Sequence, residues 1–188
     1  MIGLVRFFFM QIIFIWLFGA CVSGADMKKE VTHMREQIEL SLIADYEQFF
    51  GNPERKYLAR AEWMSGLTLD GGEILETEDS HGGFLGDGHT ILRVQYDDDV
   101  FQKLVKNVQG KEYWHALPFP EDARGWFTDG AGEELELPED GFYFLYDRHS
   151  EADTPYDEME IFERYSVNFS AAFLDTERNR LLYIEEDS

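Results

Sequence analysis

Two amphipathic helices are predicted before residue 67, because apolar residues recur there at steps of three and four. Between residues 27 and 50 this spacing places one apolar set on a single helical face: Val31, Met34, Ile38, Leu42, Tyr46 and Phe49. Gly51 ends the pattern, and Asn52-Pro53 starts a second helix with a capping residue and a first-turn proline. The second helix ends at Gly66. We expect both apolar stripes to pack against a core.

From residue 73 the apolar period changes to two, which is typical of strands. Leu92, Val94 and Tyr96 alternate with polar residues and predict a half-buried strand. Residues 73–78 are a weaker strand candidate that would pair with it. Asp97 then caps a third helix, whose inner face would consist of Val100, Phe101, Leu104, Val105 and Val108.

The second half of the chain predicts further strands around an irregular stretch. Residues 109–141 have no clear period, and a structureless loop of that length is improbable, so we expect a short element there, with 133–137 as one candidate. Residues 141–146 are apolar on both faces, as in a central strand. Alternation returns over 167–173, and 181–185 closes a hairpin with that strand.

This order of elements predicts an α+β fold. We expect an N-terminal membrane or signal helix, followed by helices packed on one face of an antiparallel sheet of about five strands. Residues 1–25 would be a signal peptide or membrane anchor, and 26–188 a single exported domain. Within that domain 26–66 would be helical, and 73–188 mainly sheet with one helix.

The first 25 residues predict export. Arg6 is their one charged side chain, and the 19 residues from Phe7 to Ala25 carry no charge. As a helix this run would span about 28 Å, close to the ~30 Å hydrocarbon core of a bilayer. A positive charge before the run is typical of the cytoplasmic side. The sequence therefore places the domain in the cell envelope, on the outer face of the cytoplasmic membrane, or in the secreted fraction.

Three export routes fit these residues. In the first, Cys21 is lipidated, because Leu17-Phe18-Gly19-Ala20-Cys21 resembles the lipobox of bacterial lipoproteins, although Phe18 stands where that family prefers an aliphatic residue. In the second, the segment is cleaved after Gly24 or Ala25, where small residues precede the cut. In the third, it stays as an uncleaved anchor, because the run exceeds a usual signal-peptide core.

Charge narrows the classes of function. The chain has 188 residues, with 16 basic and 38 acidic side chains and a net charge of −22. Such a charge excludes a nucleic-acid binder that neutralises phosphates, and the single cysteine excludes an internal disulfide. Acidic residues gather in the predicted loops, as a solvated face or as a steering surface for a basic protein partner or for cations.

A glycine-rich segment over residues 80–89 is the first candidate site. Asp87 and His89 are two residues apart, so on an extended segment they face the same side, and His81 could fold back toward them. These three side chains could hold a divalent metal or transfer a proton. The alternative is a wide glycine turn whose polar groups bond its own backbone. The glycine spacing matches neither a P-loop nor the dinucleotide fingerprint.

A second polar cluster, Asp147-Arg148-His149-Ser150, follows the predicted central strand. Neighbours on one extended segment cannot align as a catalytic triad, so the alternative is a polar strand end with an Arg148–carboxylate pair. If the central strand lies beside the strand that contains His89, the two clusters would share one rim. The combined candidate site is then His81, Asp87, His89, Asp147 and His149.

Three phrases carry a resemblance: His81 to Gly88, Phe142 to Ser150, and Arg164 to Phe169. They resemble a loose group of small exported or membrane-anchored bacterial proteins of unknown function. The resemblance implies a bacterial, envelope-side location and assigns no catalytic role to any residue.

We therefore expect an envelope-associated binding or interaction protein, attached to the membrane through residues 1–25, with an acidic surface and no cofactor. We favour this reading over an enzyme. The alternative is a small metal-dependent hydrolase, with a divalent ion held by His81, Asp87 and His89.

Overall fold

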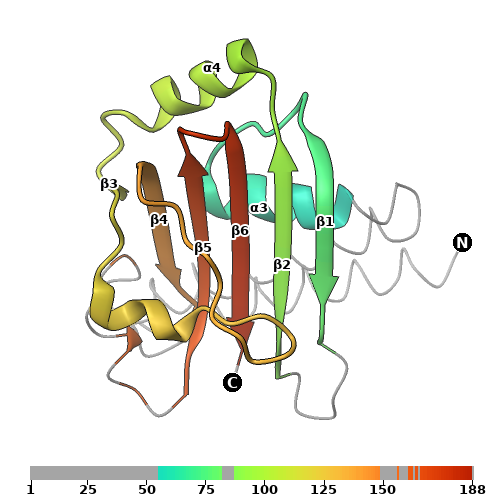
Figure 1. Ribbon diagram of the computed structural model, residues 1–188, viewed down its shortest axis with the longest axis vertical. Helices are drawn as coiled ribbons and strands as arrows, with labels where there is room; N and C mark the ends of the chain where they lie inside the picture. Colours follow the sequence, from blue (N-terminus) through green and yellow to red (C-terminus); the bar gives the residue numbers. More distant parts are fainter. Residues whose placement is uncertain are drawn as a thin grey trace, which may run out of the picture. The chain divides into compact units, whose positions relative to one another are not determined.

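Antiparallel strand pairing organises the protein, as the computed structural model shows (Figure 1). The structure describes residues 55–81, 87–148, 156, 161–162, 164 and 166–187. Within them the helices and strands are α3 (Arg55–Ser65), β1 (Glu73–Asp79), β2 (Gly88–Gln95), α4 (Asp98–Val108), β3 (Trp114–Ala116), the 3-10 helix η1 (Glu121–Trp126), β4 (Gly141–Asp147), β5 (Asn168–Asp175) and β6 (Arg180–Asp187). The α+β class is confirmed.

The strands form one six-stranded sheet in the order β1-β2-β6-β5-β4-β3. The predicted pairing of β1 with β2 and the predicted β5–β6 hairpin are both confirmed. The hairpin inserts between β2 and β4, because β6 pairs with β2 and β5 pairs with β4. The central strand of the prediction therefore does not lie beside the strand of His89, and that part of the combined site is wrong.

Both described α-helices contribute to the core on one face of the sheet, as predicted. Leu58, Ala61 and Met64 of α3 are buried there, together with Phe101, Leu104, Val105 and Val108 of α4. The sheet contributes alternate residues, among them Leu92, Val94, Leu181 and Tyr183. Burial of this apolar surface, at about 25 cal/mol per Å², supplies the main stabilisation of the layer.

The ends of the two helices follow their sequence signals in part. Gly66, with a φ of +63°, closes α3 in a backbone region that suits glycine. Asp97 is the N-cap residue of α4, as predicted, but its side chain makes no capping hydrogen bond. Asp98 and Asp99 in the first turn suit the helix dipole instead.

The opposite face of the sheet is covered by residues 117–140, which we call the acidic cover. Its buried side chains are apolar: Phe119, Ala123, Phe127, Leu135 and Leu137. They pack with the other set of alternate strand residues, including Ile91, Phe169, Phe173, Leu182 and Ile184. The sheet thus lies between helices on one face and an irregular segment on the other.

The irregular stretch contains the short elements that the sequence did not locate. Strand β3 pairs with β4 through three residues, which raises the sheet from about five strands to six. η1 follows, and the candidate short element at 133–137 contributes an isolated bridge between Thr128 and Glu134.

The predicted leader and the helix over residues 27–50 lie outside the described residues. Among the residues that are described, none of the helices combines the length and the apolar character needed to cross a bilayer.

Candidate functional site

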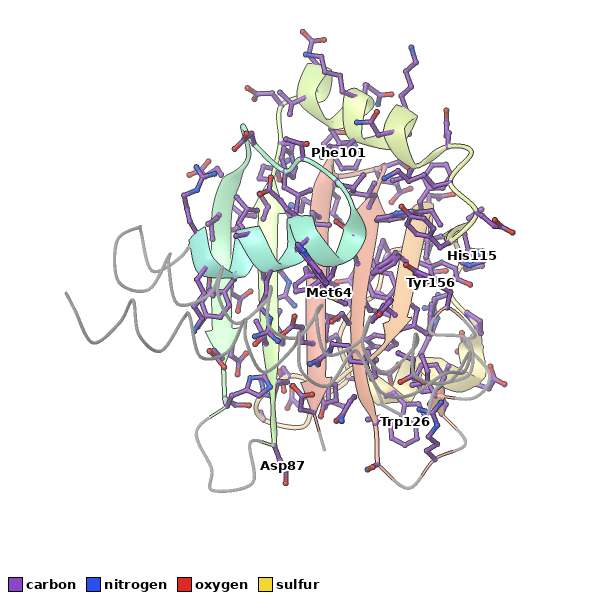
Figure 2. The ribbon with its side chains drawn as sticks, turned by 180° about the vertical axis from the view of Figure 1, so that it is seen from behind. Met64, Asp87, Phe101, His115, Trp126 and Tyr156 are labelled. Atoms are coloured by element: carbon purple, nitrogen blue, oxygen red, sulfur yellow. The ribbon has the colours of Figure 1, made fainter. Side chains whose placement is uncertain are left out.

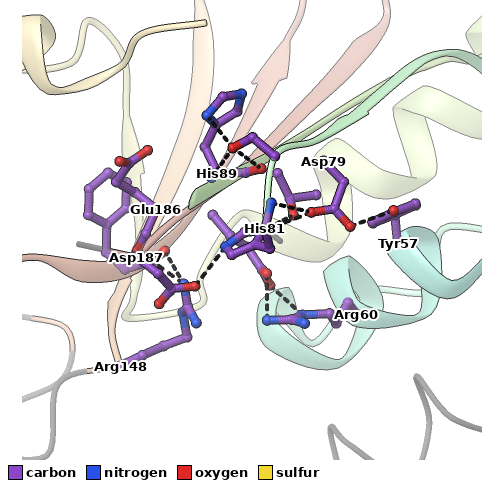
Figure 3. A network of polar contacts seen from close by, with 12 residues as sticks. Tyr57, Arg60, Asp79, His81, His89, Arg148, Glu186 and Asp187 are labelled. Atoms are coloured by element: carbon purple, nitrogen blue, oxygen red, sulfur yellow. Dashed lines mark hydrogen bonds and ion pairs between the residues drawn. The ribbon is translucent and has the colours of Figure 1, made fainter. Parts of the chain in front are cut away.

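Polar side chains from α3, β1 and β6 meet near one end of the sheet, on the helix-covered face (Figure 3). We call this set the polar network. Its members are Lys56, Tyr57, Arg60, Asp79, His81, Thr90, Arg148, Tyr183, Glu185 and Asp187. The alternation of β6 puts Glu185 and Asp187 on this face, while Glu186 between them faces the acidic cover.

The centre of the polar network is a bidentate ion pair. Arg60 Nε donates to Glu185 Oε1 at 2.8 Å, and Arg60 Nη2 lies 2.6 Å from Glu185 Oε2. The Glu185 side chain is 1% exposed and also accepts a hydrogen bond from the Tyr183 hydroxyl. Burial raises the pKa of Tyr183 well above its usual value, and the nearby Glu185 charge raises it further.

Asp79, at the end of β1, is bound from two sides. Tyr57 Oη donates to its Oδ2 at 2.7 Å, and the Lys56 Nζ lies 3.4 Å from the same oxygen. Burial alone would raise the pKa of Asp79, but hydrogen bonds from Tyr57 and His81 outweigh it and hold the pKa at about 2. The carboxylate is therefore ionised at neutral pH and ties α3 to β1.

His81 lies between two carboxylates from the strands on either side of β2. Its Nδ1 is 2.8 Å from Asp79 Oδ1, and its Nε2 is 3.0 Å from Asp187 Oδ2. The Nη2 of Arg148 lies 3.1 Å from Asp187 Oδ1, so the predicted Arg148–carboxylate pair is present. Gly88 permits this arrangement, because a Cβ there would stand 2.8 Å from the His81 backbone nitrogen.

His89 lies on the other face of the sheet. It is directly opposite Glu186, whereas Asp187 next to it binds His81. Its Nδ1 is 3.0 Å from Ser80 Oγ, and its Nε2 is 3.2 Å from Glu78 Oε1. Burial raises the pKa of Glu186, and the proximity of His89 lowers it in part. His81 and His89 are thus separated by the sheet.

The other predicted site residues do not join either histidine. Phe169 of β5 and Glu186 of β6 lie between Asp147 and His89 across the sheet, and Asp147 is ion-paired with Arg164 at 2.6 Å. Asp87 is exposed immediately before β2 and points away from the sheet (Figure 2). His149 lies outside the described residues. No cluster of three or more potential metal ligands occurs among the described side chains.

The polar network cross-links secondary structure. Each of its three carboxylates, Asp79, Glu185 and Asp187, contacts a basic side chain. Sequence reasoning missed Arg60 and Glu185 because 125 residues separate them. The available signal was the position of Arg60 next to the apolar stripe of its helix, where a buried partner is required.

The acidic cover is strongly one-sided in charge. It contains eight carboxylates and one basic residue, Arg124. Arg124 Nη1 lies 2.7 Å from Glu139 Oε1, and its Nε lies 3.3 Å from Glu121 Oε2. The hydrogen bond from Arg124 lowers the pKa of Glu139. The cation of this segment is therefore already neutralised.

Four carboxylates of the acidic cover remain available at its outer surface. Within the described chain, no basic side chain is ion-paired with any of them: Asp122, Glu133, Glu134 and Asp140. All four are exposed, while the apolar residues between them face the sheet. The arrangement holds negative charge on a supported surface, which suits long-range attraction of a cationic partner.

Comparisons with known proteins identify no relative: no family model, no curated protein and no solved structure matches the chain.

Proposed function

We propose that the protein is an envelope-associated binding protein whose acidic cover engages a basic protein partner. The observation that carries the proposal is the two-sided construction of residues 117–140. Their apolar side chains are buried against the sheet, and their carboxylates face solvent with one neutralised arginine among them. A firmly packed support fixes where the negative potential lies, which favours recognition over general solubility.

The alternative of a metal-dependent hydrolase gains no support from the placement of its residues. His81 and His89 approach different carboxylates on opposite faces of the sheet. Asp147 is ion-paired with Arg164. It lies on β4, and two strands, β5 and β6, separate it from His89 on β2. A metal site needs its ligands within about 2 Å of one ion, and the two described histidines do not meet this requirement together.

The proposed partner surface is tested with a lysine-rich peptide and two charge-matched variants of the full chain. The first variant neutralises the acidic cover: Asp122→Asn, Glu133→Gln, Glu134→Gln and Asp140→Asn. The second changes four exposed carboxylates elsewhere: Glu73→Gln, Asp99→Asn, Glu112→Gln and Glu177→Gln. Both lose the same charge, so a difference between them reports position rather than net charge.

We expect the first variant to bind the peptide about tenfold more weakly than the second, because four exposed ion pairs contribute roughly 0.3–0.5 kcal/mol each. We also expect affinity for the wild type to fall as salt is added. Equal binding by the two variants, or affinity independent of salt, would remove the acidic cover as the binding surface.

Location is tested separately. The uncharged run from Phe7 to Ala25 behind Arg6 supports delivery to the envelope. If the wild type is labelled with lipid and Cys21→Ala is not, the lipoprotein route is established. If the wild type carries no lipid label and Cys21→Ala associates with the membrane as the wild type does, an uncleaved anchor is favoured. Recovery of the full-length chain from the cytosol, with its leader intact, would overturn the envelope location.

A further inference from the structure

Trp126, the last residue of η1, is an exception within the acidic cover. Its neighbours in the cover bury their aromatic rings, with Phe119 2% exposed and Phe127 0% exposed. Trp126 is 37% exposed. Its side chain is labelled in Figure 2. Tryptophan has a large apolar surface that is usually buried. Where it is exposed, it is frequently part of a protein interface.

The indole is supported from one side. Its ring centre lies 5.8 Å from that of Phe162, with 32° between the ring planes. Phe162 itself makes ring contacts with Phe119, Phe127 and Phe169 of the buried layer. Trp126 is therefore held against packed aromatic residues, and a ligand that contacts its exposed side need not first order a mobile side chain.

The charges around Trp126 specify the kind of ligand. Glu121 and Asp122 are exposed in the same short helix. Arg124, two residues away, is held by Glu121 and Glu139. Cation–π contacts in the described chain involve Tyr57 and Tyr113 and not Trp126. The surface thus presents an aromatic face among carboxylates, and its one arginine, Arg124, is paired with Glu121 and Glu139 instead of contacting the indole.

We propose that the exposed face of Trp126 stacks on an arginine side chain of the partner protein, while the surrounding carboxylates pair with neighbouring basic residues. This inference rests on the proposed function and adds the contact point and the preferred cation. Arginine is preferred over lysine, because a planar guanidinium stacks on an indole and keeps its donors free for carboxylates.

The test compares two peptides of equal charge, one rich in arginine and one rich in lysine, with three variants of the full chain. Trp126→Ala removes the ring, and Trp126→Phe keeps an aromatic face. Leu75→Ala is the matched control, because Leu75 is also exposed, at 47%, but lies on β1 outside the acidic cover. Circular dichroism at the binding temperature verifies that each variant is folded.

We expect Trp126→Ala to weaken binding of the arginine peptide about three- to thirtyfold, the range that a cation–π contact supplies. The loss for the lysine peptide should be smaller, Trp126→Phe should retain part of the affinity, and Leu75→Ala should bind like the wild type. This pattern would support the contact.

Two results overturn the inference in distinguishable ways. If Trp126→Ala binds both peptides like the wild type, while neutralising the acidic cover weakens binding, the proposed function stands and the role of Trp126 falls. If the wild type binds neither peptide, or if neutralising the cover has no effect beyond its charge-matched control, the proposed function fails and the inference fails with it.

Discussion

Arg60 on α3 and Glu185 on β6 form a bidentate ion pair, and the carboxylate of Glu185 is buried in the protein. The pair crosses from the helix layer to the sheet, and Tyr183 adds a third contact to the acid. A buried charge of this kind is tolerated only when its partners are present, since its removal from water is costly.

Replacing Arg60 with Ala should therefore destabilise the protein by about 3 kcal/mol or more, because Glu185 would remain buried without its counter-charge. Urea unfolding at neutral pH measures the change. Arg55→Ala is the control, because Arg55 and Asp70 are 52% and 69% exposed, and such a pair contributes at most about 1 kcal/mol. Equal effects of the two substitutions would contradict the account of Glu185.

Asp79 should make stability depend on acid pH. Its pKa is about 2 in the folded protein and about 3.9 in an unfolded chain. The carboxylate therefore adds stability above about pH 4 that is lost as the pH falls toward 2. Allowing for solvent screening of a partly exposed group, we expect roughly 1 kcal/mol. The free energies of unfolding of the wild type and Asp79→Asn should converge by that amount on acidification.

Tyr57→Phe provides the companion measurement. It removes the hydroxyl that donates to Asp79 and leaves the ring in place. As the pH is lowered, the free energy of unfolding of this variant should begin to fall at a higher pH than that of the wild type. The reason is that the pKa of Asp79 rises when a hydrogen-bond donor to its charged form is removed. A difference between wild type and Asp79→Asn that does not vary with pH would disprove the role of Asp79.

Gly141, at the start of β4, should not tolerate a side chain. A Cβ there would stand 1.8 Å from the carbonyl oxygen of Leu174, and its φ is +132°. We expect Gly141→Ala to destabilise the protein by about 3 kcal/mol, from overpacking combined with backbone strain. Gly125→Ala is the control, because a Cβ at Gly125 meets nothing within 4 Å. Thermal unfolding of the two variants would separate them.

Phe127 and Trp126 are adjacent in the chain but should differ in their effect on stability. Phe127 is fully buried, and its ring centre lies 5.1 Å from that of Phe119 and 5.4 Å from that of Phe173. Phe127→Ala should cost about 3–5 kcal/mol and expose the acidic cover to proteolysis. Trp126→Ala should cost much less. A similar loss in both would mean that Trp126 is a core residue and not a contact surface.

Local patterns predicted the elements whose partners are close in the chain. The alternation around Leu92 and the hairpin ending at Glu185 gave correct strands, and the stripe from Phe101 to Val108 gave the buried face of α4. These features depend on period and on short connections, which a sequence shows directly.

Long-range arrangement was beyond the same reasoning. The residues of β4 contain no pattern that predicts the insertion of β5 and β6 between β4 and β2. This insertion separates Asp147 from His89. Likewise β3 contains three residues, too few for a period, and η1 has no alternation to detect. The pairing of Glu185 with Arg60 requires the tertiary fold before either partner can be recognised.

The position of β6 has a consequence for biosynthesis. It is the last described strand in the chain, yet it joins β1–β2 on one side to β5, β4 and β3 on the other. A ribosome must therefore complete Arg180–Asp187 before the two halves of the sheet can unite. Until those residues are made, the β1–β2 pair has no strand that joins it to β5, β4 and β3, so the sheet can close only late in synthesis.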